Sequence, residues 1–409
     1  MIQPFLLTVS FLFVLIGWSG CSEKNYFEPQ EVKGSVQYDG ELPAPIVEIG
    51  YEGATLADGE YITKEGGLQT YHLPEGYRFI SQTEDRVVAA GDCKPNIVYN
   101  VKTHRSLEVA LPRRLVAGLI IPGSDMLAFV IEGNSFGLYD LAAGKVVAKY
   151  DSDPATSADI RIANPKMLDQ LVLMPTLDGK LVILKKDTGE KIREIIVGKG
   201  KEFNNIIYLN VIGDRLVAAT PHRIISVSPK IMDAQSMEIA DVIFVSDAIY
   251  ILGKNGTIYH CDVDLKILNK KKFPFAHFVG AIYGEFIYAV EREGYIIATD
   301  PNLAVANVFE LPDRIDRWFF TTPDAFYYDK YYFRLNTSTA APTQEAASPA
   351  ESDRDLSNGE GNATRHPAPS STQAGGEEGE DSLSVEGLWH AFKGMFQPDE
   401  SNDTIQSDE

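Results

Sequence analysis

The apolar and polar residues of this chain alternate in short runs that repeat along its length. Four segments of 26 residues align without a gap: 126–151, 170–195, 248–273 and 286–311. Each begins with a strand-forming run, then has a turn, a second apolar run, a second turn and a third run. The first turns contain Glu132–Gly133–Asn134, Asp178–Gly179, Asn255–Gly256 and Glu293–Gly294. Such residues favour tight turns with positive φ, so each segment is predicted to form antiparallel hairpins.

Weaker copies of the same unit begin at Arg86, Arg215 and Ala325. The seven starts lie at residues 86, 126, 170, 215, 248, 286 and 325, and their spacing averages about 40 residues. Between residues 33 and 336 no apolar pattern of helical period extends over helical length. A hairpin unit of this size cannot bury both of its faces alone, so the copies must stack. Repeats of this length with three or four short strands are typical of β-propeller blades.

We therefore predict an all-β fold, a single β-propeller over residues 33–336. The 304 residues of this region allow seven or eight blades. We favour eight because residues 54–73 look like a further, degenerate blade. The runs GSVQY (34–38) and PIVEI (45–49) are then expected to pair with the last unit and close the ring, which removes exposed sheet edges. A pair of β-sandwiches is the structural alternative, but it gives no reason for a steady period.

Two of the repeats carry a more specific signature. The runs LYDLAAGKVV (138–147) and ILKKDTGEKI (183–192) resemble the repeat of quinoprotein-type propellers, in which an apolar run is followed by Asp, two residues, Thr-Gly, and Lys or Glu. That family usually places next a Trp that locks neighbouring blades together. Here Ala148 and Arg193 stand at about that position. The resemblance therefore supports the architecture, whereas the family's quinone-dependent chemistry is not expected.

The N-terminus has the layout of a secretory signal. Residues 5–16 are apolar apart from Thr8 and Ser10, and two small residues precede Cys21. An apolar stretch of this length is too short to span a bilayer comfortably. A Cys after two small residues resembles the lipobox of bacterial lipoproteins, which implies removal of residues 1–20 and acylation of Cys21. Ser22 implies, by the family's sorting rule, the periplasmic face of the outer membrane. An ordinary signal peptide or a short uncleaved anchor is the alternative.

The expected domain order continues with a tether over residues 21–32, the propeller, and a polar tail. Residues 337–383 and 397–409 are acidic or rich in small polar residues, and such composition predicts disorder. Between them, residues 384–396 place apolar side chains along one side of a short helix. These side chains are the candidate partner-docking residues Leu388, Trp389, Phe392, Met395 and Phe396. The helix is expected to dock on a partner protein, and folding back onto the propeller or an inert leftover are the alternatives.

Charge narrows the classes of partner. The net charge is −21, of which residues 337–409 contribute −12 through 15 acidic and 3 basic residues. An acidic surface argues against binding of nucleic acid, which needs Lys and Arg to displace counterions, and against overall attraction to anionic lipids. Cys93 and Cys261 are far apart in the sequence and are expected to be buried, unpaired thiols, and a disulfide between them is the alternative.

No residues of the propeller region assemble a recognisable catalytic motif. Neither a G-x-S-x-G elbow nor a glycine-rich phosphate loop is present. His260 and Cys261 are adjacent on a predicted strand, so their side chains should diverge rather than bind one metal ion. Asp151, Asp153 and Asp159 are expected to lie in a solvated loop. We therefore predict no catalytic residue, no metal and no cofactor.

An acylated propeller of this type is similar to the accessory lipoproteins of the outer-membrane β-barrel assembly machine. That resemblance implies a non-enzymatic, monomeric scaffold that binds periplasmic or outer-membrane proteins. The alternative is a degenerate quinoprotein-like or ligand-binding propeller with a pocket at the central channel. Charged side chains that converge from several blades at one channel mouth would support the alternative, whereas a channel filled with apolar and small residues would support the scaffold.

Overall fold

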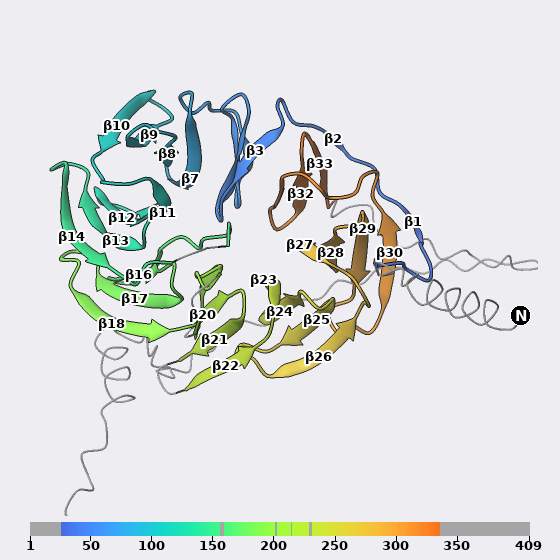
Figure 1. Ribbon diagram of the computed structural model, residues 1–409. Coiled ribbons are helices and arrows are strands. Elements are labelled where there is room, and N and C mark those ends of the chain that lie inside the picture. Colours follow the sequence, from blue (N-terminus) through green and yellow to red (C-terminus); the bar gives the residue numbers. More distant parts are fainter. Residues whose placement is uncertain (1–25, 156–158, 201–202, 214, 229–230, 336–409) are drawn as a thin grey trace, which may run out of the picture. The chain divides into compact units, whose positions relative to one another are not determined.

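The chain folds into eight small antiparallel sheets arranged in a ring, as the repeat predicts (Figure 1). A computed structural model describes residues 26–335 apart from 156–158, 201–202, 214 and 229–230. These described residues form strands and turns, and they include no helix long and apolar enough to cross a membrane. The eight-bladed β-propeller prediction is confirmed, and the sandwich alternative is excluded.

Each blade has an innermost strand near the centre and an outermost strand at the rim. The first four blades consist of β3 (Ile46–Ile49), β4 (Gly53–Leu56), β5 (Tyr61–Thr63) and β6 (Gly67–Gln69); β7 (Tyr77–Thr83), β8 (Arg86–Gly91), β9 (Asn96–Asn100) and β10 (Arg105–Val109); β11 (Leu115–Ile120), β12 (Met126–Ile131), β13 (Ser135–Asp140) and β14 (Lys145–Asp151); and β15 (Lys166–Leu168), β16 (Leu171–Pro175), β17 (Lys180–Lys185) and β18 (Lys191–Ile196).

Blades 5 to 8 follow the same order, and the last has three consecutive strands. They consist of β19 (Tyr208–Ile212), β20 (Arg215–Thr220), β21 (Arg223–Val227) and β22 (Met232–Ser236); β23 (Ile239–Val245), β24 (Ala248–Gly253), β25 (Thr257–Cys261) and β26 (Ile267–Lys272); β27 (Phe278–Tyr283), β28 (Ile287–Glu291), β29 (Tyr295–Thr299) and β30 (Ala306–Glu310); and β31 (Phe319–Thr321), β32 (Ala325–Tyr328) and β33 (Tyr331–Arg334).

The hydrophobic core is divided among the gaps between successive blades. Ile80 and Val88 of blade 2, for example, pack with Leu115 and Phe129 of blade 3 in one buried cluster. Another cluster joins Ile282 of blade 7 to blade 8. Burial is deepest on the second strands, such as β12 and β24, because these strands lie between two other strands and between two neighbouring blades. Stacking of blades therefore supplies the burial that a single blade lacks.

Tyrosine hydroxyls connect neighbouring blades where the family resemblance places Trp. Gly189 of the next blade lies so close to Ala148 that a methyl group on Gly189 would approach the Ala148 side chain to 2.4 Å. Two residues beyond Ala148, the Tyr150 hydroxyl donates to the carbonyl of Gly189 at 3.0 Å and accepts from the amide of Lys191 at 3.2 Å. The tight Ala148–Gly189 contact leaves no room for an indole, and Tyr150 makes the connection instead.

Two short strands near the N-terminus close the ring. β2 (Gly40–Glu41) pairs antiparallel with β33 as the outermost strand of blade 8, and β1 (Gly34–Ser35) pairs parallel with β30 as a fifth strand of blade 7. The prediction that the N-terminal part closes the ring is therefore correct, but residues 34–35 pair with blade 7 and not with the last unit, whose partner Gly40–Glu41 lies outside the two predicted runs. The prediction that residues 45–49 pair with the last unit is wrong: β3 occupies the innermost position of blade 1, because β2 already takes the free edge of β33.

Before β1, the chain packs in the groove between blades 6 and 7. Phe27 is only 5% exposed there. Its ring meets those of Phe273 and Tyr295 edge to face, with centroid distances of 6.4 and 5.6 Å. The residues that precede the ring-closing strands thus have a fixed position on the propeller.

Replacing Phe27 by Ala is expected to lower the free energy of unfolding by roughly 3 kcal/mol, because a buried aromatic ring and its packing are lost. Denaturant unfolding of the purified chain measures the change. Tyr26→Ala is the control, since Tyr26 is 44% exposed, and its effect should stay below about 1 kcal/mol. Equal effects of both substitutions would show that Phe27 does not hold the segment.

Candidate functional site at the mouth of the central channel

Residues 159–165, which precede β15, extend into the centre of the ring (Figure 1). Asn164 accepts from the amide of Gly118 in blade 3 at 3.2 Å and donates to the carbonyl of Ile80 in blade 2 at 3.1 Å. On the other side, the Arg161 guanidinium donates to the carbonyl of Ala240 in blade 6. These partners lie on innermost strands, so the segment lines the channel and connects blades across it.

A paired carboxylate and guanidinium hold this segment in shape. Arg161 donates to both oxygens of Asp159, with Nε–Oδ1 at 2.8 Å and Nη2–Oδ2 at 2.6 Å. The side chain of Asn205 accepts from the backbone amide of Asp159 and donates to the backbone carbonyls of Asp159 and Arg161. Burial alone would raise the pKa of Asp159, but the hydrogen bonds and charge of Arg161 outweigh burial and keep that pKa below its usual value. The expectation of a solvated loop is therefore wrong for Asp159, since its carboxylate is mostly buried.

An ion pair between blades 1 and 4 lies between two hollows at the channel mouth. The turn between β3 and β4 carries Glu52, whose carboxylate lies 3.3 Å from the Lys166 ammonium of blade 4. One hollow has a volume of 430 Å³ and is lined by blades 1 to 4, and the other has a volume of 290 Å³ and is lined by blade 1 and blades 4 to 8. Four charged residues line both hollows: Glu52, Lys64, Glu65 and Lys166. Side chains from all eight blades thus meet at this mouth.

The smaller hollow has the more unusual chemistry. Burial raises the pKa of the Asp241 carboxyl above its usual value, although the charges of Arg161 and Lys64 act in the opposite direction. Burial also raises the pKa of the Tyr51 and Tyr208 hydroxyls, so both remain protonated and able to donate hydrogen bonds. The Lys64 ammonium lies 4.2 Å from the centre of the Tyr51 ring. Such a set can bind a small polar molecule by charge and hydrogen bonds.

Sequence reasoning did not find these residues, because no motif links them. Tyr51, Arg161 and Asp241 come from three distant parts of the chain and meet only when the ring closes. The convergence of charged side chains is the outcome that we expected for the ligand-binding alternative. The channel mouth therefore supports binding of a small ligand as a second candidate function.

Other residues that the sequence singled out lie elsewhere. Cys21 and the docking residues Leu388, Trp389, Phe392, Met395 and Phe396 fall outside the described residues. Cys93 and Cys261 are both free thiols, as expected, but Cys93 is exposed in the turn between β8 and β9, so its predicted burial is wrong. A positive φ of 55° places it at the tip of that turn.

His260 and Cys261 diverge as predicted. Cys261 is fully buried in a cluster with residues of blade 5, and burial raises its pKa to about 12. His260 points to the opposite face of β25 and stacks on Tyr250 with ring centroids 4.8 Å apart. The two side chains therefore cannot bind the same ion.

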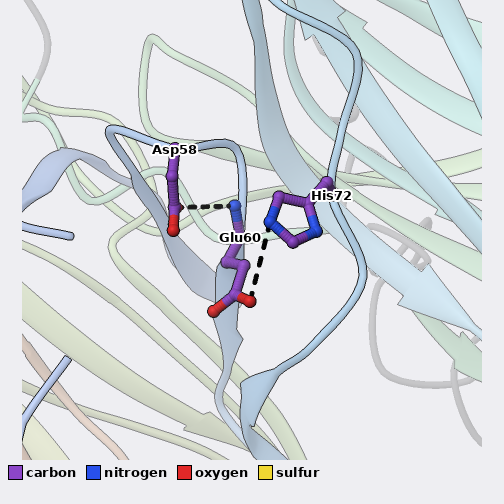
Figure 2. A group of neighbouring side chains, drawn as sticks. All are labelled: Asp58, Glu60 and His72. Carbon is purple, nitrogen blue, oxygen red and sulfur yellow. Dashed lines mark hydrogen bonds and ion pairs between the residues drawn. The ribbon is translucent and has the colours of Figure 1, made fainter. Parts of the chain in front are cut away.

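One group that the sequence did not suggest has ligand atoms close together. Atoms of Asp58, Glu60 and His72 all lie within 4.8 Å of one another at the edge of blade 1 (Figure 2). Asp58 accepts from the backbone amide of Glu60 at 3.0 Å, and the Glu60 carboxylate lies 3.7 Å from His72 Nε2. A local turn and a surface ion pair account for the arrangement, so we assign it no ligand.

Comparison with known proteins gives relatives at the level of sequence and neighbours at the level of fold. No family model matches the chain. Plasminogen-binding protein PgbB of Helicobacter pylori strain J99 is 28% identical over 390 residues, which cover 82% of this chain and 71% of that protein. The protein of the same name from a second strain, 26695, is 27% identical over 389 residues with the same coverage. The chain is thus similar to these proteins over most of its length.

Solved structures confirm the architecture. BamB from Moraxella catarrhalis superposes with a TM-score of 0.55 at 15% identity, over 72% of this chain and 97% of that one. The C-terminal WD40 domain of Sif2 gives a TM-score of 0.56 at 11% identity, over 75% and 99% of the two chains. At such low identity these likenesses show the propeller fold alone.

Asp241→Asn is expected to become more stable relative to the unmodified protein as the pH rises. Because the pKa of Asp241 is raised in the folded state, its protonated form stabilises the fold below the unfolded-state pKa of about 3.9, and this contribution is lost as the pH rises through the folded-state pKa. Asn cannot ionise, so it avoids that loss. Urea unfolding between about pH 4 and pH 8 measures the difference.

Asp169→Asn, an exposed position between β15 and β16, serves as the control and should give a constant difference. A difference for Asp241→Asn that falls with rising pH would mean that the carboxylate is stabilised, not penalised, in the channel.

Proposed function

We propose that the chain is a non-enzymatic, protein-binding β-propeller, attached by a lipid on Cys21 to the periplasmic face of the outer membrane. The observation that carries this proposal is the similarity, over 82% of the chain, to proteins named for binding another protein. The propeller fold fits such a role, since it presents a large rigid surface. The partners are proteins, and neither a cofactor nor a nucleic acid takes part.

The rim of the propeller offers a surface for such partners. In blade 7, β1 covers β30, and in blade 8 the two-residue β2 is itself the outermost strand, whereas β10, β14, β18, β22 and β26 of blades 2 to 6 have no strand beyond them among the described residues. The uncovered outermost strands also expose apolar side chains, including Leu107, Val147, Ile196, Met232 and Leu268. An uncovered strand presents unpaired backbone groups to which an extended segment of another protein can add.

Partner binding at the rim fits the role suggested by resemblance, assembly of outer-membrane proteins. In that setting the propeller holds a client or a periplasmic domain by strand addition. We propose that the segment 384–396 contributes separately, with Leu388, Trp389, Phe392, Met395 and Phe396 docking as a short helix in a groove of another protein. The propeller itself acts as a monomer, since its ring is closed within one chain.

A second candidate function is binding of a small polar molecule at the channel mouth. It is favoured by the meeting of Asp241 and Lys64 with two tyrosine hydroxyls around a hollow of 290 Å³, where the charge of Arg161 also acts on Asp241. The two functions are compatible, because the rim and the channel mouth are formed by opposite ends of each blade.

Site-specific photo-cross-linking tests the rim. A photoreactive amino acid at position 196 in β18 is expected to give a discrete adduct with a protein partner in intact cells, because Ile196 is 50% exposed on an uncovered outermost strand. Mass spectrometry of the adduct identifies the partner. The control is position 47, where Val47 is 47% exposed on the innermost strand of blade 1. No adduct at position 196, or the same adducts at both positions, would refute binding at the rim.

Cys21→Ala tests the lipid attachment. The variant is expected to move from the membrane fraction to the soluble fraction after a high-salt wash, because acyl chains supply most of the affinity of a lipoprotein for a bilayer. Intact-mass measurement should show the acyl mass on the unmodified protein and its absence from the variant. Retention of the washed variant in the membrane would contradict attachment through Cys21.

A further inference from the structure

The chain enters the propeller at a defined place on its rim. Residues 26–33 line a hollow of 850 Å³ together with Lys271, Lys272 and Phe275 at the end of blade 6, and with residues 306–308 of blade 7. Phe27 fixes the segment there, and the amide of Lys33 donates to the carbonyl of Val308 at 2.8 Å as β1 begins. The first described residue therefore lies beside the outer edge of blade 6.

This position limits how the propeller can face a bilayer. Cys21 and Tyr26 are separated by five residue steps, which span at most about 18 Å when fully extended. A lipid on Cys21 thus holds the rim of blades 6 and 7 close to the membrane, while the opposite side of the ring faces away.

The rim at this place has a composition unlike that of the chain as a whole. β26 ends in three consecutive lysines, Lys270, Lys271 and Lys272, in a chain with a net charge of −21. None of β10, β14, β18 and β22 contains such a run. Beside the lysines, Phe275 is 51% exposed and Val305 is 59% exposed.

Lys271, Lys272 and Phe275 line the same hollow as Ala306, the residue that follows Val305. The Lys271 ammonium donates to the carbonyl of Ala304 at 2.8 Å, which places the blade 6 strand next to Val305. Lys272 donates to the carbonyl of Asn255 within its own blade. Of the carboxylates in the adjoining N-terminal segment, Glu31 is paired with Lys33 at 2.6 Å, and Glu28 is exposed. The Asp300 carboxylate accepts from the amide of Val305 at 2.6 Å, so the patch combines three lysines and two exposed apolar side chains with the neighbouring carboxylates of Glu28 and Asp300.

We propose that Lys270, Lys271, Lys272, Phe275 and Val305 form a membrane-contact surface that binds the headgroups of anionic phospholipids. Lysine ammonium groups attract phosphate at a negatively charged surface, and exposed Phe and Val side chains can enter the boundary between headgroups and acyl chains. This inference rests on the lipid attachment of the proposed function and adds an orientation to it. Lysines also protect free sheet edges from pairing, but edge protection does not require the exposed Phe275 and Val305 beside them.

Vesicle sedimentation of the chain from Ser22 onward, which lacks the acylated residue, tests the surface by itself. Binding to phosphatidylcholine vesicles that contain phosphatidylglycerol is expected to exceed binding to pure phosphatidylcholine. Replacement of Lys270, Lys271 and Lys272 by Gln should lower the affinity roughly 100-fold, since each lysine near an anionic surface contributes about fivefold. The matched control replaces Lys145, Lys185 and Lys191, exposed lysines of blades 3 and 4, and should leave binding unchanged.

A second measurement uses the acylated protein reconstituted into the same anionic vesicles. An amine-reactive reagent that does not cross bilayers should modify Lys185 and Lys191 readily and Lys270, Lys271 and Lys272 slowly. Equal effects of the two triple variants, or equal reactivity of the two sets of lysines, would overturn the membrane-contact surface. Neither result bears on acylation, which Cys21→Ala tests separately. A failure of the membrane-contact surface can therefore be distinguished from a failure of the lipid attachment.

Discussion

The structure depends on burial of the faces of each blade against its two neighbours. A sheet of four short strands has two apolar faces and cannot bury either one alone, and the clusters that contain Phe129, Ile282 and Cys261 each span a gap between blades. An open row of such sheets would leave one apolar face exposed at each end. Closure removes both exposed faces, and β1 and β2 join the ends by backbone hydrogen bonds. The rigidity of the rim and the meeting of distant side chains in the channel both follow from this closure.

Closure also gives the molecule two chemically different regions. At the centre, the Asp159–Arg161 segment and the Glu52–Lys166 pair lie among the innermost strands, beside the two hollows. At the rim, the N-terminal strands β1 and β2 form the outer edges of blades 7 and 8, whereas the outermost strands of blades 2 to 6 have no strand beyond them among the described residues. Charged and polar side chains are therefore concentrated in the channel, whereas uncovered strand edges and exposed apolar side chains are concentrated at the rim.

The sequence predicted the ring because its strongest signal comes from the most buried strands. All seven repeat starts fall within one residue of the first residue of a second strand, from Arg86 of β8 to Ala325 of β32, and glycines such as Gly179 and Gly256 have the positive φ that their turns require. The innermost strands were not predicted one by one, because strands as short as β15 and β31 carry too little alternation. Asp58, Glu60 and His72, like the channel residues, are brought together by tertiary structure. Cys93 is exposed because it lies at the tip of the turn between β8 and β9, and the apolar pattern of the sequence does not show where that tip lies.

Pairing of β2 with β33 has a consequence for how the protein is made. The amide of Arg334 bonds the carboxylate of Asp39 across 295 residues of sequence. A ribosome or export channel that releases the chain from its N-terminus must therefore deliver all eight blades before the final hydrogen bonds can form. Until then the first and last blades lack their partners, and contacts of such long sequence separation form slowly. The topology thus delays completion of the fold until blade 8 has been delivered.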